Sequence, residues 1–295
     1  MLDEQLMGVA ARLATSLEAL AALAAHIRIE TEGLEPEPEV RALLQEIATA
    51  LVGDGSSFDH AQPIVGLTQT LLGQAAELVA RPDRPGGWVH TDDRLLQGTG
   101  RMSMAIAPVI THVAEQLDGL AARLSAPDAA FLDVGTGAGW LAIALAKMHP
   151  GLRVVGIDIF DPALELAQRN REATGLDARI ELRRQDVTTL DEEAVYDAVW
   201  LPLPFLPRAV VLPAIAAAAR ALRPGGWLIP GLYGGPPDEL SQLICDLRTV
   251  RSGGHAWGVD ELVGELDAHG LNGGREIARH WKAPVRLFAA QRPAE

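Results

Sequence analysis

The first third of the chain repeats apolar residues at helical spacing and shows no alternating strand pattern. From Leu2 to Ile27, leucine, valine and isoleucine recur every three or four residues, which predicts one long amphipathic helix. Prolines 36 and 38 interrupt the pattern, and the same spacing then predicts helices over 40–51 and 64–80. Stripes this apolar need a partner, so we expect these helices to cap the rest of the chain or to form a dimer interface.

From residue 131 onward the pattern changes to short apolar runs that alternate with helical segments. Such alternation is typical of a parallel sheet covered by helices. The expected strands lie at 131–134, 153–157, 179–182, 196–202 and 222–230. Two more are expected at 276–281 and 285–291, joined by a tight connection at Lys282-Ala-Pro284.

Three glycines at alternate positions, Gly135, Gly137 and Gly139, separate the first strand from a helical run. Glycines let bare backbone approach a ligand, and the N-terminus of the following helix offers free N–H groups. A dinucleotide fingerprint has its third glycine at the sixth position of the motif, where this chain has Trp140. The spacing therefore disfavours a nicotinamide site.

Gly-x-Gly-x-Gly preceded by Asp133 resembles the first motif of the class I S-adenosylmethionine-dependent methyltransferases. The later pieces of that family follow in order: Asp158 after the second strand, Asp186 after the third, and Leu-Arg-Pro-Gly-Gly at 222–226. The resemblance covers about 131–230. It implies an α/β fold, a Rossmann-like seven-stranded sheet with a terminal antiparallel hairpin, preceded by an all-helical N-terminal domain. The expected domains are 1–87, for capping or dimerisation, and 88–295, for methyl transfer.

The resemblance also implies S-adenosyl-L-methionine as the cofactor and gives roles to residues around it. Asp158 would accept the ribose hydroxyls, and Asp186 would take the adenine amino group, with Val187 against the ring. Arg101 would pair with the cofactor carboxylate, with Gln97 one turn earlier on the same helix. The complete predicted cofactor set is Gln97, Arg101, Asp133, Gly135, Thr136, Gly137, Gly139, Asp158, Ile159, Asp186, Val187, Leu201 and Pro202.

The chain has few aromatic residues, and several of them lie in the loops that should face the substrate. We expect Trp88, Phe205, Tyr233 and Trp257 to line the substrate site, and His255 and His90 are the candidate general bases. Methyltransferases of amide or exocyclic amino nitrogens often carry Asn/Asp-Pro-Pro-aromatic after the fourth strand. This chain has Pro-Leu-Pro-Phe at 202–205. We therefore expect a small apolar or aromatic substrate methylated on oxygen, carbon or a ring nitrogen.

Charge and composition limit the classes of partner that the protein is expected to bind. The formal net charge of −14 disfavours a nucleic-acid partner. The single cysteine, Cys245, cannot form an internal disulfide, which fits a cytoplasmic location. We see no metal cluster, signal peptide or apolar run long enough for a membrane span. The expected partners are a small molecule, from secondary metabolism, and a second copy bound through the N-terminal helices. A nicotinamide-dependent oxidoreductase and a non-catalytic cofactor-binding dimer remain the alternatives.

Overall fold

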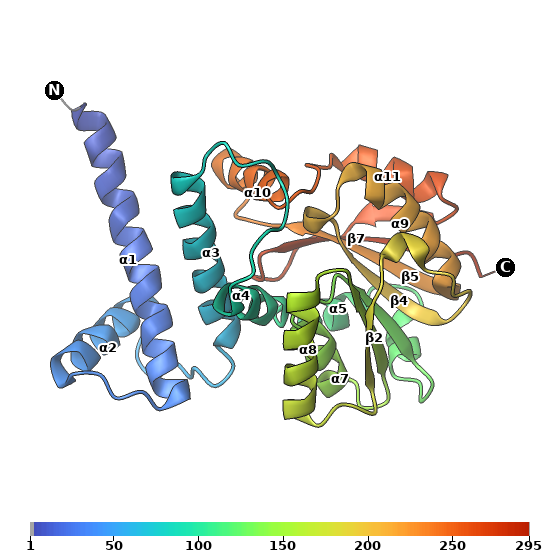
Figure 1. The fold of residues 1–295 in the computed structure, drawn as a ribbon, viewed down its shortest axis with the longest axis horizontal. Helices are drawn as coiled ribbons and strands as arrows, with labels where there is room; N and C mark the ends of the chain where they lie inside the picture. Colours follow the sequence, from blue (N-terminus) through green and yellow to red (C-terminus); the bar gives the residue numbers. More distant parts are fainter. Residues whose placement is uncertain (1–2, 295) are drawn as a thin grey trace.

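The computed structural model describes residues 3–294, so Leu2 of the predicted stripe lies outside the described residues. Three helices form the N-terminal region, close to their predicted bounds: α1 (Glu4–Glu32), α2 (Pro38–Val52) and α3 (Gln62–Ala80). Asp3 caps α1 by accepting from the Gln5 N–H, and Gly33 ends it in the left-handed conformation. The N-terminal half of α1 projects away from the rest of the molecule (Figure 1).

The second part of the chain is a seven-stranded sheet in the order β3-β2-β1-β4-β5-β7-β6. The strands β1 to β5 are parallel, and β7 runs antiparallel to both β5 and β6. This confirms the predicted fold class. The strand bounds are β1 (Ala130–Val134), β2 (Arg153–Asp158), β3 (Ile180–Arg184), β4 (Tyr196–Pro202), β5 (Leu222–Tyr233), β6 (Asn272–Glu276) and β7 (Val285–Gln291).

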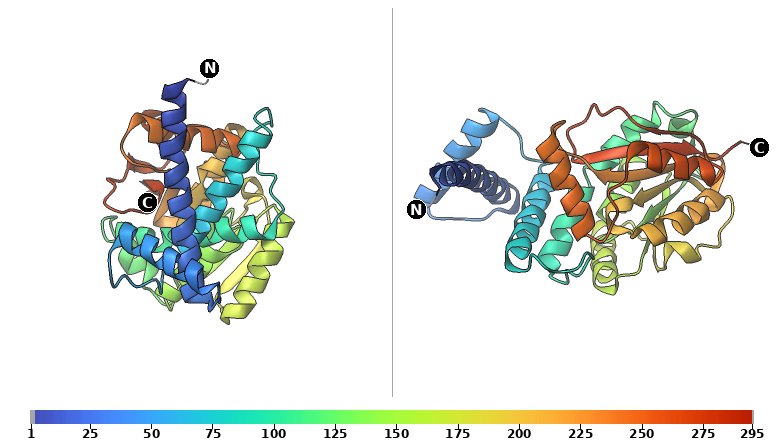
Figure 2. Two further views of the ribbon diagram at one scale, coloured as in Figure 1. Left: turned by 90° about the vertical axis from the view of Figure 1, so that its left-hand side faces the viewer. Right: turned by 90° about the horizontal axis from the view of Figure 1, so that it is seen from above.

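Helices cover both faces of the sheet, and alternate residues of each strand supply the two cores. On β1, Phe131 packs toward the helices α5 to α7, whereas Leu132 packs toward α9 and α11. Figure 2 shows the sheet enclosed between these helices, with α1 to α3 set to one side. The helix bounds are α4 (Asp93–Ser103), α5 (Ile106–Ala114), α6 (Leu120–Leu124), α7 (Trp140–Met148), α8 (Asp161–Thr174), α9 (Arg208–Ala221), α10 (Glu239–Arg251) and α11 (Val259–Ala268).

The helix α4 connects the N-terminal region to the sheet. It packs against α3 on one side and against α7 and α8 on the other. Two glycines of α4 allow these close approaches: a Cβ on Gly98 would lie 3.2 Å from the Cβ of Gln69, and one on Gly100 would lie 2.7 Å from the Trp140 ring. The N-terminal region is therefore anchored directly beside the glycine turn that follows β1.

The predicted terminal antiparallel pair is present as β6 and β7, but the predicted tight connection at Lys282-Ala-Pro284 is wrong. The strand β6 ends at Glu276, and residues 277–284 form an irregular loop before β7. Two side chains that looked like strand residues bond to the backbone of this loop: Arg279 donates to the Ala283 carbonyl, and Trp281 donates to the Val285 carbonyl. Because these bonds satisfy the local carbonyl groups, the ladder with β7 does not extend past the start of the loop.

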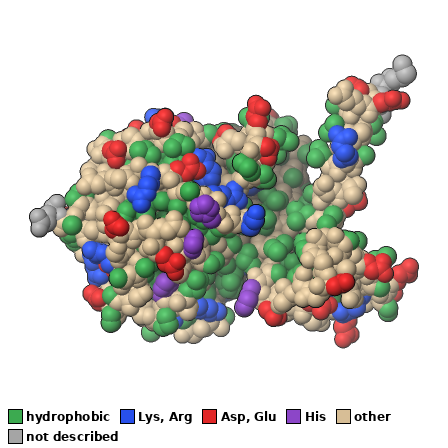
Figure 3. Space-filling view, turned by 180° about the vertical axis from the view of Figure 1, so that it is seen from behind, with side chains coloured by type: hydrophobic (Ala, Val, Ile, Leu, Met, Phe, Trp, Pro, Cys, Tyr) green, Lys and Arg blue, Asp and Glu red, His purple; other side chains and the backbone are tan. Residues whose placement is uncertain are grey.

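The helix α1 does not meet the expectation that no segment of the chain could span a membrane. By length and composition alone, α1 is apolar enough to do so. Its most apolar stretch is entirely unburied by the rest of the described chain, with Leu6 65% and Leu13 63% exposed. In α2, Leu43 and Leu51 are also exposed. Figure 3 shows hydrophobic side chains in the recess between these helices and the main body. The N-terminal region thus leaves an apolar surface uncovered.

Candidate functional site

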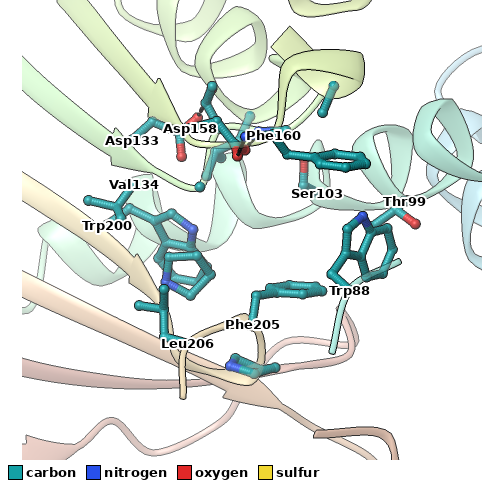
Figure 4. Close-up of a pocket in the computed structure, with 18 of the residues that line it drawn as sticks. Trp88, Thr99, Ser103, Asp133, Val134, Asp158, Phe160, Trp200, Phe205 and Leu206 are labelled. Carbon is teal, nitrogen blue, oxygen red and sulfur yellow. Dashed lines mark hydrogen bonds between the residues drawn. The ribbon is translucent and has the colours of Figure 1, made fainter. Parts of the chain in front are cut away.

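A cavity of about 430 Å³ opens at the carboxyl ends of β1, β2 and β4, the usual ligand position in such sheets. It extends from the glycine turn to a group of aromatic side chains, and α4 closes one side. Figure 4 shows Asp133 and Asp158 on one side of this cavity, and Trp88 and Phe205 on the opposite side. The cavity therefore has a polar part and an apolar part.

The turn after β1 is left-handed at all three motif glycines, with φ of 62° at Gly135, 56° at Gly137 and 77° at Gly139. Residues that carry a side chain rarely adopt these φ angles. Around Gly137, a Cβ would meet only a carbonyl oxygen 3.9 Å away, so the space beside its backbone is open. The turn is fixed by the Thr136 N–H, which donates to the Ile157 carbonyl at 3.0 Å. This arrangement presents bare backbone to the cavity.

Two carboxyl groups lie directly beside this turn. Asp158 accepts from the Gly137 N–H at 2.8 Å and from the Phe160 N–H at 2.9 Å. Asp133 is almost fully buried and accepts from the Thr136 hydroxyl at 2.7 Å. Burial raises the pKa of Asp158, and burial together with the nearby Asp158 raises the pKa of Asp133 to about 7. The two acids thus lack a compensating cation, and a ligand with a positive charge and hydroxyl donors would satisfy them.

Some of the remaining predicted cofactor residues line the cavity, and others do not. The cavity is lined by Thr136, Ile159, Asp186, Val187 and Pro202, in addition to Gly135, Gly137 and the two acids. Asp186 begins a short 3-10 helix, η1 (Val187–Thr189), by accepting from the Thr188 N–H. The structure therefore brings these residues together, and their binding of a cofactor stays a prediction.

Four predicted cofactor residues do not line the cavity. Gly139 packs against α8, where a Cβ on it would lie 3.1 Å from the Ala167 Cβ. The amide of Gln97 accepts from the Trp140 indole N–H at 2.6 Å and donates to Asn170 at 3.0 Å. Arg101 packs beside Gly66 of α3, on the face of α4 that is turned toward the N-terminal helices. Leu201 lies in the core under α9, because its neighbours on β4, Trp200 and Pro202, take the cavity side. These four residues therefore lie outside the cavity lining, which corrects their assignment.

The apolar part of the cavity is an aromatic wall formed by Trp88, Phe205 and Tyr233. Phe205 makes edge-to-face contacts with both others, with ring centroids 5.4 Å from Trp88 and 6.0 Å from Tyr233. Phe205 is positioned by the short 3-10 helix η2 (Leu203–Phe205), whose backbone is restricted by Pro204 and by Pro202 at the N-cap. Aromatic faces at these spacings form a surface suited to a flat, apolar ligand.

Trp257 and both candidate bases lie outside the cavity. Trp257 is buried in the core near Leu262, with the Arg208 guanidinium 5.2 Å from its ring. His255 stacks edge-on against Trp257, 3.5 Å from a Glu261 oxygen. His90 contacts the Trp88 ring edge-to-face at 4.9 Å between ring centroids, and burial lowers its pKa. The structure places none of these three side chains at the substrate surface, so those assignments are corrected.

Several cavity residues were not expected from the sequence. Leu96, Thr99, Gly100 and Ser103 all lie on one face of α4 and line the cavity. Their spacing of three and four residues is the signal that identifies this face, and Gln97 and Arg101 belong to other faces. Residues 3–294 contain no group of three or more His, Cys, Asp or Glu side chains that could hold a metal ion.

Comparison with known proteins agrees with this geometry. Residues 131–226 match the family model described as a methyltransferase domain. The demethylmenaquinone methyltransferase of Thermus thermophilus is 36% identical over 113 residues, which cover 38% of this chain and 51% of that protein. The chain spans about half the length of the first curated relatives that it matches.

Solved structures share the fold over nearly the whole chain. An O-methyltransferase from Nostoc punctiforme described as putative has a TM-score of 0.65 at 14% identity, covering 99% of this chain and all of the other. Human N-acetylserotonin methyltransferase has a TM-score of 0.66 at 13% identity, covering 98% and 97%. Residues 131–226 therefore carry a methyltransferase domain, and nearly the whole chain shares its fold with these solved methyltransferase structures.

Proposed function

We propose that the protein transfers a methyl group from S-adenosylmethionine to oxygen, carbon or a ring nitrogen of a small, flat, largely apolar molecule. One observation carries this proposal. The same cavity combines the open glycine turn and two uncompensated carboxyl groups at one end with an aromatic wall at the other. A nucleoside that carries a positive charge fits the first end, and a flat acceptor fits the second.

The residues beside the turn fit the cofactor by their chemistry. Each oxygen of Asp158 already accepts one backbone N–H and retains acceptor capacity for a ribose hydroxyl. Asp133 would face the amino group of the methionine part, and Asp186 with Val187 would hold the adenine. When bound, the cofactor supplies an activated methyl group on a sulfonium. The chain then has to align the acceptor and exclude water, which the aromatic wall and α4 do.

The substrate class follows from the wall and from the loop after β4. Trp88, Phe205 and Tyr233 give apolar faces, and Pro202 and Pro204 offer no side-chain acceptor for an amino group. The names of two compared proteins specify demethylmenaquinone and N-acetylserotonin, which are small molecules. Both observations support a small-molecule acceptor, and a role in secondary metabolism stays a prediction.

Calorimetric titration with S-adenosylhomocysteine tests the cofactor assignment. We expect stoichiometric binding of S-adenosylhomocysteine, no binding of NAD, and a fall in affinity of about 10- to 100-fold in Asp158→Ala. Asp128→Ala, an exposed acid far from the cavity, is the matched control and should bind like the wild type. Binding of NAD in place of S-adenosylhomocysteine would favour the oxidoreductase instead. A non-catalytic protein would bind the cofactor and methylate no acceptor.

We further propose that the exposed apolar surface of α1 and α2 is covered by a second copy of the chain. Four leucines are about half exposed or more: Leu13 and Leu17 on α1, and Leu43 and Leu51 on α2. Sedimentation should give a dimer at micromolar concentration, and Leu13→Asp with Leu43→Asp should give a monomer. A wild-type monomer that floats with phospholipid vesicles would instead assign this surface to a membrane and would contradict the predicted cytoplasmic location.

A further inference from the structure

Among the described residues, no group on the aromatic side of the cavity could remove a proton from the acceptor at neutral pH. Among the described residues that line it there is no histidine, lysine, cysteine or glutamate. Its titratable groups are three aspartates and Tyr233. Asp133 and Asp158 lie at the glycine turn, across the cavity from Trp88 and Phe205 (Figure 4). Asp186 is exposed and accepts from the Thr188 N–H and hydroxyl. All three aspartates are on the side assigned to the cofactor.

Tyr233 is the one titratable group in the aromatic wall, and it is a poor base. Burial raises its pKa, opposed mainly by a hydrogen bond from Ser252, so the hydroxyl stays protonated at neutral pH. Thr99 and Ser103 contribute only hydroxyl groups, and the Ser103 hydroxyl donates to the Gly100 carbonyl at 2.6 Å. None of these groups accepts a proton from a weakly acidic acceptor at neutral pH.

We infer that the acceptor is a flat conjugated molecule with an acidic hydroxyl, a phenol or enol that is already ionised at neutral pH when it enters the cavity. This inference rests on the proposed methyl transfer. The acceptor oxygen, having lost its proton to solvent beforehand, attacks the methyl carbon. The O–C bond forms, the S–C bond breaks, and the electron pair of that bond stays on sulfur as a neutral thioether.

The apolar wall favours this class over a neutral ring nitrogen. An anionic oxygen and the cationic cofactor neutralise each other, so an uncharged ether is left between Trp88, Phe205 and Tyr233. A ring nitrogen would instead leave a cationic product against the same apolar side chains, which is unfavourable without a paired charge. In the cavity wall, the described residues include no carboxylate beside these three rings that would pair with such a cation.

A series of naphthols whose acidity is graded by nitro and cyano substituents tests this inference. The pH profile of kcat/KM should rise to a plateau at each acceptor's own solution pKa, so the inflection should move along the series. At pH 7, the rate should rise about threefold for each unit by which the acceptor pKa falls toward 7. The absorption band of a nitronaphthol bound together with S-adenosylhomocysteine should be that of the anion.

The outcomes separate this inference from the proposed function. If S-adenosylhomocysteine does not bind, the proposed function fails. If it binds, three results overturn the inference alone: an inflection at one fixed pH for all naphthols, a weakly acidic naphthol methylated as fast as an acidic one, or methylation of a neutral ring nitrogen with no acidic naphthol methylated. In Tyr233→Phe the inflection should still follow the acceptor. An inflection lost in this variant would make Tyr233 the base and would also overturn the inference.

Discussion

The indole N–H of Trp140 donates to the side-chain oxygen of Gln97 at 2.6 Å. Trp140 begins α7 directly after the glycine turn, and Gln97 lies in the middle of α4. Asn170 of α8 joins them by donating to the Ala138 carbonyl at 2.8 Å and exchanging hydrogen bonds with Gln97. One amide group therefore links three helices around the turn.

Gln97→Ala should loosen this linkage. It leaves the Trp140 N–H without a partner, so we expect the free energy of unfolding to fall by about 1–2 kcal/mol in urea denaturation. The affinity for S-adenosylhomocysteine should fall severalfold, because the turn is held less firmly. Gln242→Ala, which removes an exposed amide on α10, should change neither value. An unchanged affinity in a destabilised Gln97→Ala would limit Gln97 to a role in stability.

The sheet and the glycine turn could be predicted because their signals are local. Buried strands are short apolar runs, and three left-handed positions require glycine regardless of what surrounds them. The face of α4 could not be chosen in the same way, since both the Leu96–Ser103 face and the Gln97–Arg101 face have helical spacing. Which one meets the cavity depends on how α4 docks against α3, through the close approach at Gly66 and Gly98.

The positions of the loop histidines could not be predicted from the sequence either. His255 follows two glycines and precedes a tryptophan, a composition typical of a substrate loop. In the structure this loop packs on the backbone of η2, where a Cβ on Gly254 would lie 2.5 Å from the Pro204 carbonyl oxygen. That contact places His255 beside Glu261 and Arg208. Residue type alone contains no information on such long-range packing.

Two helical glycines should respond in opposite directions to alanine. A Cβ at Gly100 would lie 2.7 Å from the Trp140 ring and 3.0 Å from the Ala138 Cβ, whereas one at Gly264 in α11 would meet nothing within 4 Å. Thermal denaturation should show Gly100→Ala destabilised by about 1–3 kcal/mol. In contrast, Gly264→Ala should be stabilised by about 0.5–1 kcal/mol. Equal gains in both variants would show that α4 does not pack tightly on the turn.

Asp133 should make stability depend on pH. Burial raises its pKa to about 7 in the folded protein, so the folded state keeps the proton at a pH where the unfolded chain has lost it. The contribution of this group to the free energy of unfolding is therefore highest below about pH 4, and it declines until about pH 7. Without ligand, Asp133→Asn should be more stable than the wild type by about 1–3 kcal/mol at pH 8 and equal to it near pH 4.

Asp128→Asn, at an exposed position, is the control for this experiment and should follow the wild type at both pH values.

Cofactor binding to the wild type and to Asp133→Asn provides a second measurement of the same titration. Binding of the cationic cofactor should release a proton from Asp133 in the wild type near pH 6.5, which calorimetry in buffers of different ionisation enthalpy detects. Asp133→Asn should bind weakly and release no such proton. Proton release of equal size in Asp133→Asn would assign the titration to another group.

The two candidate histidines should be dispensable for methyl transfer. Neither His90 nor His255 lines the cavity, and His255 is taken up by contacts with Trp257 and Glu261. We expect His90→Ala and His255→Ala to keep turnover within about twofold of the wild type at saturating cofactor. A fall of tenfold or more in either variant, with the pH dependence lost and the fold intact by circular dichroism, would restore that histidine as a general base.

Phe205 should determine how well the acceptor binds without affecting the cofactor. Its ring contacts both Trp88 and Tyr233 edge-on, so its removal takes away the centre of the aromatic wall. Phe205→Ala should raise KM for an aromatic acceptor about tenfold, corresponding to about 1.4 kcal/mol of lost packing. Affinity for S-adenosylhomocysteine should stay within about twofold, because Phe205 lies opposite Asp133 and Asp158.

Leu240→Ala, at an exposed position on α10, controls for general effects of truncation. An unchanged KM in Phe205→Ala would place the acceptor elsewhere, whereas a matching loss of cofactor affinity would show that the aromatic wall also helps to bind the cofactor.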